Sequence, residues 1–330
     1  MNRRFRCNQA FAALILWTGT AIASPAQTFT VLTSFLKSNK NYPACVALAQ
    51  GTDGNLYGTT LWGGNTKKAC GLGCGTVFAV TPAGALTTAH KFGSTNGEGP
   101  LAGVILARDG SFYGTTDEGG PANAGTVFRI TSRGTLTNLH NFQGSDGAGP
   151  QAALVENVDG NFYGSTTGGG ASNGGAIFKI TPAGVLTTLY SFCAQANCPD
   201  GQAPYSPLIE AADGNFYGTT NQGGGSTACQ DFYGPIGCGT IFKITPAGTL
   251  TTLYVFQGID DGAVPYGALV EGPDGNLYGT TTRGGGSTAC ETAWGITGCG
   301  RIFMVTPGGA LTTLHAFQDT DGLYFTQGWL

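Results

Sequence analysis

The sequence predicts an all-β protein, a β-propeller of about five four-stranded antiparallel blades. A hexapeptide of the form Asp-Gly-Asn-Leu-Tyr-Gly recurs five times, and its copies start 56, 50, 54 and 61 residues apart. Each repeat holds four short strand-like runs, and four antiparallel strands in a unit of about 40 to 50 residues form the usual propeller blade. A β-solenoid is the competing architecture, but its coils are generally shorter than this repeat. The copies lie at 53–58, 109–114, 159–164, 213–218 and 274–279.

Residues 1–26 have the layout of a secretory signal peptide. Arginines precede an apolar run over 10–17, and small residues follow over 21–26. The apolar run is too short to cross a bilayer, which takes about 20 apolar residues. The alternative is an N-terminal membrane anchor. Because no other stretch approaches that length, we expect the mature chain to be exported, either secreted or at the cell surface, without an integral membrane segment.

The remaining residues, 27–330, are predicted to form one repeat domain. A run at 29–35 matches the fourth strand of a repeat, so the chain enters the pattern part-way through a unit. A tail over 318–330 stops about where a first strand would run. The two ends either pair into a partial sixth blade or belong to a chain shortened relative to its relatives. The five full units are approximately 43–92, 99–142, 149–192, 203–256 and 264–317.

Turn chemistry indicates how the four strands of a unit are joined. In the last unit the strands are predicted at 268–271, 276–281, 301–306 and 311–317. Asp-Gly forms the first join and Pro-Ala-Gly or Pro-Gly-Gly the third, because glycine supplies the positive φ that tight hairpins need. The second and fourth joins are longer. In an up-and-down meander all tight hairpins then lie on one face and all long joins on the other, where we expect a functional site.

The second strand of each unit, Leu-Tyr-Gly-Thr-Thr in the last copy, carries a glycine where a side chain would be expected. Glycine inside a strand indicates a close approach of another group to the backbone. In the third strand, Phe178 and Ile180 alternate with Lys179, so the two apolar side chains are predicted to face the core.

The composition limits the classes of partner. Charged residues make up 10% of the chain, against a usual value of about 25%. The formal net charge is −4, and removal of the signal peptide, with its three arginines and no acid, makes it −7. A mildly acidic chain with few basic residues is a poor candidate for binding nucleic acid or an anionic membrane. It suits an exported protein that faces polar, uncharged material such as a polysaccharide or another cell-surface ligand.

The repeats resemble a known family. Their consensus runs Asp-Gly-Asn-Leu/Phe-Tyr-Gly-Thr-Thr, then Gly-Gly, then Gly-Thr-Val/Ile-Phe-Lys-Ile-Thr-Pro-Ala-Gly-x-Leu-Thr-Thr-Leu-Tyr-x-Phe, and it is similar to the GloVer tandem repeat over residues 29–320. That repeat belongs to exported bacterial proteins described as choice-of-anchor, because different members end in different surface-sorting segments. The resemblance implies an exported or surface-displayed repeat protein and implies no catalytic residues. No stretch after Phe317 resembles a sorting segment, so the means of attachment stays open.

Eight cysteines form four closely spaced pairs in the predicted long joins. Close spacing and export favour local disulfides. The alternative is zinc, since Cys70 and Cys74 have ligand-like spacing, but a four-ligand site needs a second pair and no histidine accompanies this one. Cys45 is left over, and it is buried, free or bonded to another chain. The predicted pairs are Cys70–Cys74, Cys193–Cys198, Cys229–Cys238 and Cys290–Cys299.

The long second joins also carry the candidate binding residues. Aromatic side chains on loops held by disulfides either stack on sugar faces or cap the blade edge. The residues concerned are Trp62, Phe232, Tyr233 and Trp294. Asp231 and Glu291 are the only acids in the equivalent extended joins of two adjacent repeats, which makes them the candidates for an acid pair in a glycan hydrolase or lyase.

Two further repeated features favour structural roles. His90, His140 and His315 share one repeat position with Tyr190 and Tyr254, a pattern typical of packing. The joins between repeats carry an Asp-Gly or Asn-Gly pair, which indicates Asx turns, with a calcium-binding ring as the weaker alternative. We therefore predict a non-catalytic binding or structural module without metal or cofactor, and the glycan-active enzyme is the alternative.

Overall fold

The structure is a computed structural model that describes residues 30–35, 47–65, 70–231, 234–258, 260–286, 290 and 298–318. Within these ranges the chain forms strands, turns and bends and no helix, so the all-β prediction is confirmed. The same ranges accordingly contain no helix long and apolar enough to cross a membrane.

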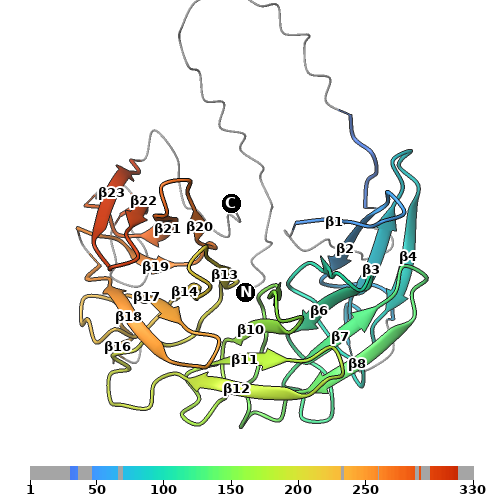
Figure 1. The fold of residues 1–330 in the computed structure, drawn as a ribbon, viewed down its shortest axis with the longest axis horizontal. Coiled ribbons are helices and arrows are strands. Elements are labelled where there is room, and N and C mark those ends of the chain that lie inside the picture. The colour runs from blue at the N-terminus through green and yellow to red at the C-terminus, as the bar shows by residue number, and fades with distance from the viewer. Residues whose placement is uncertain are drawn as a thin grey trace, which may run out of the picture.

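Five antiparallel sheets, one per repeat, make up most of the described chain. Figure 1 shows them side by side in an arc around a common centre, with the first strands on the inner side and the fourth strands outside. This is the arrangement of propeller blades. By blade, the strands are β1 (Ala49–Gln50), β2 (Leu56–Thr60), β3 (Thr76–Val80) and β4 (Leu86–Lys91); β5 (Ile105–Leu106), β6 (Phe112–Thr116), β7 (Thr126–Ile130) and β8 (Leu136–Asn141); β9 (Val155–Glu156), β10 (Phe162–Thr166), β11 (Ala176–Ile180) and β12 (Leu186–Ser191); β13 (Ile209–Glu210), β14 (Phe216–Thr220), β17 (Thr240–Ile244) and β18 (Leu250–Val255); and β19 (Ala263–Pro265), β20 (Val270–Glu271), β21 (Leu277–Arg283), β22 (Arg301–Val305) and β23 (Leu311–Ala316).

The last blade matches its predicted strands with two differences. Its second strand, β21, extends to Arg283 rather than ending at 281. Its inner strand forms ladder pairs over β20 and, earlier in the chain, over β19, and both segments pair with β21. The first strand of every other blade is likewise only two residues long. A small hairpin that the sequence patterns did not predict, β15 (Gln230–Asp231) and β16 (Gly234–Pro235), lies in the second join of blade 4.

The hexapeptide forms the first hairpin of each blade by hydrogen bonding within itself. In blade 3 the Asp159 carboxylate accepts hydrogen bonds from the backbone and side chain of Asn161 at 2.9 and 2.8 Å. The hydroxyl of Tyr163 donates a third at 3.1 Å. The aspartate therefore fixes the turn and also holds the tyrosine of the strand that follows, which explains why these residue types recur together.

The glycine of the second strand has a packing role. Gly164 on β10 pairs in register with Phe178 on β11. A Cβ atom on Gly164 would lie 2.6 Å from the ring of Phe178, so only a bare backbone allows the ring to lie there. The predicted close approach is thereby confirmed. Phe178 and Ile180 are fully buried and Lys179 is half-buried, as the alternation predicted.

Aromatic stacks hold neighbouring blades together. The ring of Tyr163 in blade 3 stacks on Phe216 in blade 4, with centroids 4.2 Å apart. The same contact joins blades 1 and 2 at 4.1 Å and blades 2 and 3 at 4.0 Å. Each such pair contributes roughly 0.5–1.5 kcal/mol beyond the area it buries. At the joint of blades 4 and 5 the phenylalanine position is taken by Leu277, which packs in the same core cluster as Tyr217.

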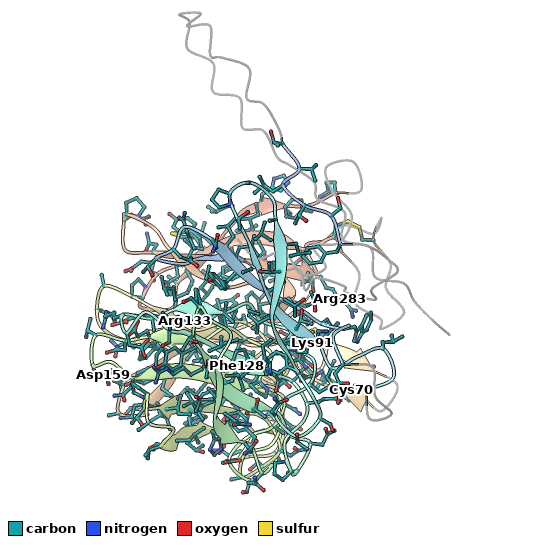
Figure 2. The ribbon with its side chains drawn as sticks, turned by 90° about the vertical axis from the view of Figure 1, so that its right-hand side faces the viewer. Cys70, Lys91, Phe128, Arg133, Asp159 and Arg283 are labelled. Atoms are coloured by element: carbon teal, nitrogen blue, oxygen red, sulfur yellow. A yellow bond between two sulfur atoms is a disulfide. The ribbon has the colours of Figure 1, made fainter. Side chains whose placement is uncertain are left out.

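The two faces of the arc differ as the meander requires. Figure 2 views the arc edge-on, with Asp159 and Arg133, which belong to tight hairpins, toward one side. Cys70, in a second join, and Lys91, at the end of a fourth strand, lie toward the opposite side. We call these the hairpin face and the long-join face. A site built from the variable joins must therefore lie on the long-join face.

Residues 30–35, which lie within the strand predicted at 29–35, form no strand ladder in the structure. They nevertheless occupy the place of a fourth strand from a preceding blade. Phe35 packs edge-on against Phe78 with centroids 5.0 Å apart, as Phe142 of blade 2 packs against Phe178 of blade 3 at 5.3 Å. The backbone of Leu32 lies against Gly84, the contact that the fourth strands of blades 1 to 4 make with the next blade. The returning first strand predicted after Phe317 lies outside the described residues.

Candidate functional site

Four disulfides secure the joins of the long-join face. They are the four predicted pairs, with Cα–Cα distances of 5.2 Å for Cys70–Cys74, 4.1 Å for Cys193–Cys198, 5.2 Å for Cys229–Cys238 and 5.1 Å for Cys290–Cys299. Such bonds are typical of an extracellular or otherwise oxidising environment. The carboxylate of Glu98 lies within 4.8 Å of the sulfurs of Cys70 and Cys74, but these sulfurs are bonded to each other and offer no thiolate to zinc. Cys45 lies outside the described residues.

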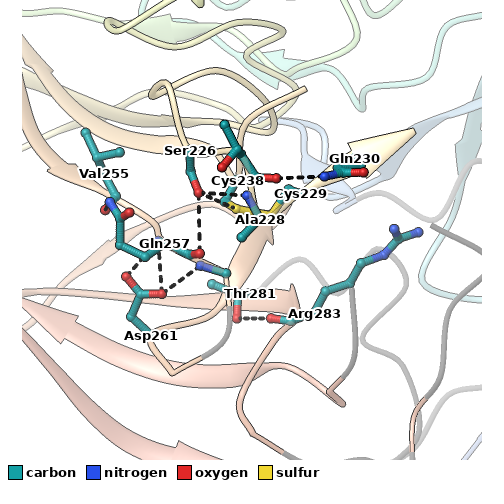
Figure 3. The surroundings of a disulfide bond; sticks show 12 residues. Ser226, Ala228, Cys229, Gln230, Cys238, Val255, Gln257, Asp261, Thr281 and Arg283 are labelled. Atoms are coloured by element: carbon teal, nitrogen blue, oxygen red, sulfur yellow. Dashed lines mark hydrogen bonds between the residues drawn. A yellow bond between two sulfur atoms is a disulfide. The ribbon is translucent and has the colours of Figure 1, made fainter. Parts of the chain in front are cut away.

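The disulfide of blade 4 closes a loop within its second join and packs on the segment that leads into blade 5 (Figure 3). The hydroxyl of Ser226 lies 3.4 Å from Cys238 Sγ and donates to the carbonyl of Gln257 at 3.4 Å. A Cβ atom on Gly258 would lie 2.9 Å from Cys238 Sγ, so the bond packs directly on this segment. The segment itself is fixed by Asp261, whose carboxylate accepts the backbone N–H groups of Gln257 and Gly258.

The candidate aromatic residues of the sequence are only partly placed. Trp62 follows β2 in the second join of blade 1, is half-buried, and its carbonyl accepts a hydrogen bond from the Thr60 hydroxyl at 2.8 Å. Asp231 lies on β15, and its side chain is outside the description. The other candidates, Phe232, Tyr233, Glu291 and Trp294, lie outside the described residues.

A group of side chains that the sequence patterns did not single out gathers on the inner side of the arc. We call Asp117, Gln151, Tyr205 and Tyr266 the axial cluster. Asp117 directly follows β6, and the other three precede the short inner strands of blades 3, 4 and 5. The side-chain amide of Gln151 donates to the Asp117 carboxylate at 3.0 Å. The rings of Tyr205 and Tyr266 stack with centroids 5.3 Å apart and 21° between their planes. One contact thus joins blades 2 and 3 and the other joins blades 4 and 5.

The electrostatics of the axial cluster favour neutral over anionic groups. Burial raises the pKa of Asp117, and the charge of Glu118 raises it further, against the opposing effect of the hydrogen bond from Gln151. Burial also raises the pKa of the Tyr205 hydroxyl, with a contribution from the Asp117 charge that ties the two residues together. Glu98, whose backbone pairs with that of Glu118, has a pKa raised by burial and by the Glu118 charge. The acids repel anions but can accept hydrogen bonds from hydroxyl groups.

An unsatisfied polar atom stands at the same repeat position as Asp117. Asn221 follows β14 as Asp117 follows β6, and its side chain is only 5% exposed. Among the described residues, no hydrogen-bond partner reaches its side-chain oxygen. Buried amide oxygens normally have a partner, so this atom marks a place where the chain has not satisfied its own hydrogen bonding.

The repeated histidine and tyrosine position proves to serve the joins between blades. His140 Nε2 lies 2.8 Å from the Asp146 carboxylate, and the hydroxyl of Tyr190 donates to Asp200 at the same distance. The Asp146 carboxylate also accepts the backbone N–H of Gln143 at 2.8 Å, three residues earlier, rather than the N–H two residues later that an Asx turn would use. The shared histidine and tyrosine position thus holds the aspartate that shapes the join.

The axial cluster escaped sequence reasoning because its members break the repeat. Asp117 stands where the other blades have Leu61, Thr167, Asn221 and Thr282. Tyr205 and Tyr266 each follow a proline, at a position occupied by leucine in blade 2 and glutamine in blade 3. Tyrosine after proline in two adjacent repeats was the available signal. This signal can be interpreted only when the position is known to lie just before the inner strand, and spacing alone does not show that.

Comparisons with known proteins agree with the fold. A family profile described as the Gloeobacter/Verrucomicrobia repeat matches residues 19–232 and 196–330. Among solved structures, the chain is similar to a virginiamycin B lyase from Staphylococcus aureus, with 16% identity, a TM-score of 0.52, and coverage of 86% of this chain and 73% of that one. It is also similar to a streptogramin B lyase, with 16% identity, a TM-score of 0.51, and coverage of 85% and 70%. A search of curated protein sequences finds no significant match.

Identity this low to the solved structures shows a shared propeller fold and nothing about shared chemistry. The family profile, in contrast, spans nearly the whole chain in two overlapping matches, and it follows the same repeats that form the blades. The GloVer resemblance inferred from the consensus is thereby confirmed. This chain belongs to the Gloeobacter/Verrucomicrobia repeat family.

Proposed function

We propose that the protein is an exported, non-catalytic binding module that holds a neutral glycan, or a similarly polar surface ligand, on its long-join face. The observation that carries this proposal is the stack of Tyr205 on Tyr266 beside the hydrogen-bonded pair of Asp117 and Gln151. Flat aromatic surface next to carboxylate and amide groups matches a sugar, which has apolar ring faces edged by hydroxyls.

The rigidity of the surroundings supports a binding role. The joins of this face are held by disulfides and by aspartate carboxylates that accept backbone N–H groups, so little freedom is lost when a ligand is bound. Sites held by a rigid scaffold in this way are favourable for recognition. The signal peptide expected at 1–26 and the disulfides together support export.

The proposed contact surface also includes the aromatic residues of the second joins. Trp62 is half-buried on blade 1 and so presents part of its ring. We propose that Phe232, Tyr233 and Trp294 also contact the ligand. The alternative function, a glycan hydrolase or lyase that uses Asp231 and Glu291, needs these two carboxyl groups to converge on one substrate bond.

Retention on insoluble neutral polysaccharides and on cell-wall preparations tests the proposal. Trp294→Ala and Tyr233→Ala should each weaken retention by an amount worth roughly 1 kcal/mol, about a fivefold loss. The double variant Asp231→Asn with Glu291→Gln is the matched control for the acids and should retain the wild-type affinity. Release of reducing ends or unsaturated sugars by the wild type, but not by that double variant, would replace the binding module with the enzyme.

A further inference from the structure

The hairpin face holds a hollow of about 380 Å³ at the joint of blades 4 and 5, remote from the long-join face. Its lining includes Ala212, Asp213, Tyr217, Glu271 and Leu277. We call it the joint hollow. It lies where Leu277 takes the place of the phenylalanine found at the three preceding joints, beside Ala211 and Ala212 in the hairpin of blade 4. The residue at the position of Ala212 is larger in every other blade, so the small side chain there and the missing ring together leave the joint hollow open.

The joint of blades 2 and 3 shows what occupies this place when the residues are larger. There Arg108 stands where blade 4 has Ala212, and its backbone N–H donates to the Glu156 carboxylate at 3.0 Å. Its guanidinium Nη1 crosses the joint and donates to the carbonyl of Asn157 at 2.9 Å. An arginine side chain therefore spans the two blades at their hairpin ends.

The joint of blades 4 and 5 has the same backbone-to-carboxylate hydrogen bond, but alanine stands in the place of the arginine. The N–H of Ala212 donates to the Glu271 carboxylate at 2.9 Å, the same contact that Arg108 makes with Glu156. The strand registers also agree, since Glu271 pairs with Leu277 as Glu156 pairs with Phe162. Gly272 takes the place of Asn157, and its carbonyl accepts one turn hydrogen bond, from Gly275, which leaves a second lone pair.

The charges around the joint hollow favour a cation. Asp213 accepts hydrogen bonds from Asn215 and from the Tyr217 hydroxyl, and the charge of Lys243 acts on this same aspartate. Glu271 has one hydrogen bond among the described residues, from Ala212, and its charge also reaches Tyr217. The positive charge of Lys243 thus offsets the negative charge of Asp213. The Glu271 carboxylate remains available to accept hydrogen bonds from an added positive group.

We propose that the joint hollow binds the side chain of an arginine presented by a partner polypeptide. Its guanidinium would donate to the Glu271 carboxylate and the Gly272 carbonyl, as the guanidinium of Arg108 donates to Asn157. Its methylenes would lie over Ala212 and Pro307, the exposed apolar residues of the lining. The planar fork of donors suits a carboxylate beside a carbonyl better than a single ammonium does. This site is independent of the glycan-binding proposal.

Titration of the full mature chain with the capped tripeptide acetyl-Gly-Arg-Gly-amide, followed by saturation-transfer NMR at low ionic strength, tests this proposal. The matched ligand control is the same peptide with citrulline, which keeps the shape and loses the charge. We expect the arginine peptide to bind at least about tenfold more tightly, the difference expected for one charge-assisted hydrogen bond. Equal binding of the two peptides would overturn the proposal.

Three variants locate the site. Ala212→Arg supplies the guanidinium from the chain itself and should abolish peptide binding. Glu271→Gln keeps an acceptor for the Ala212 N–H and should weaken binding about tenfold. Glu210→Gln, one joint away where the Asn157 side chain already donates to Glu210 at 2.9 Å, is the control and should bind as the wild type does. Equal weakening by Glu271→Gln and Glu210→Gln would contradict the assignment, even if Ala212→Arg failed to fold.

Discussion

The ring of Tyr205 in blade 4 stacks on the ring of Tyr266 in blade 5, although the two residues are far apart in the sequence. Both occupy the same repeat position, directly after a proline and four residues before the inner strand. In a propeller, equal positions in consecutive blades come together around the axis. A substitution repeated in two neighbouring units therefore creates a contact surface that neither unit has alone. The axial cluster arises in this way.

The stacks between blades predict how the fold responds to a smaller side chain. Phe216→Leu removes the ring that Tyr163 stacks on, and we expect a loss of about 1–2 kcal/mol in the free energy of unfolding. The loss should be moderate, because the joint of blades 4 and 5 already accommodates leucine. Urea unfolding compares the variant with Val158→Ala, a change at a side chain that is 79% exposed. Equal midpoints for the two variants would rule out a stabilising stack.

The aspartates of the hexapeptide predict a sensitivity to acid. Burial acts to raise the pKa of Asp213, but hydrogen bonds from Asn215 and Tyr217 outweigh it and hold the pKa below its usual value. An acid whose pKa is lowered in the folded state stabilises the fold above its unfolded pKa of about 3.9 and loses that contribution as the pH falls further. Asp213→Asn should therefore be less stable than the wild type at neutral pH.

The difference between Asp213→Asn and the wild type should shrink as the pH falls below about 4. Thermal unfolding between neutral and strongly acidic pH measures it, with Asp260→Asn at an exposed position as the control. A difference that grows toward acid would show that the sign of the pKa shift is wrong.

Local chemistry explains how much of the fold the sequence predicts. The turn of Asp159, the bare backbone of Gly164 and the cysteine pairs each depend on residues close in the sequence or on one strand pairing, so their patterns were sufficient. The run at 29–35 has the composition of a fourth strand, but a strand ladder also needs a partner. Residues 30–35 keep the ring contact of Phe35 and form no ladder, because composition alone does not supply that partner.

The candidate site was less predictable for a physical reason. Asp117 and Gln151 belong to different blades and are hydrogen-bonded to each other. Their contact depends on the angle between the blades rather than on a spacing in the sequence. The joint hollow likewise results from small residues in two separate repeats. Repeats predict the shared scaffold well, but function resides in the positions where repeats differ, and those are interpretable only once the scaffold is known.

Asp117 predicts a conflict between stability and binding. Its pKa is raised mainly by burial, so its ionised form is disfavoured in the folded state. For an acid with a raised pKa, stability falls as the pH rises through the unfolded value and stays reduced above the folded value. Asp117→Asn, which keeps an acceptor for Gln151, should therefore be at least as stable as the wild type at neutral pH.

The stability gain of Asp117→Asn should disappear in acid, where the wild-type carboxyl is protonated, and its ligand retention should be weaker at neutral pH. Functional groups are often retained at such a cost in stability. Urea unfolding and polysaccharide retention on the same samples measure both effects. A variant that is clearly less stable at neutral pH would mean that Asp117 is structural.

The most direct measurement of the central claim is retention on neutral polysaccharide by the variants Tyr205→Ala and Tyr266→Ala. Tyr278→Ala is the matched control, because it removes the same type of side chain from the hairpin face, where the Tyr278 hydroxyl donates to Asp274 at 2.8 Å. A binding module that uses the axial cluster predicts that each of the first two variants loses about fivefold or more in affinity, as expected for about 1 kcal/mol per stacking contact. Tyr278→Ala should bind as the wild type does. Undiminished retention by both axial variants, or an equal loss in all three, would contradict the account.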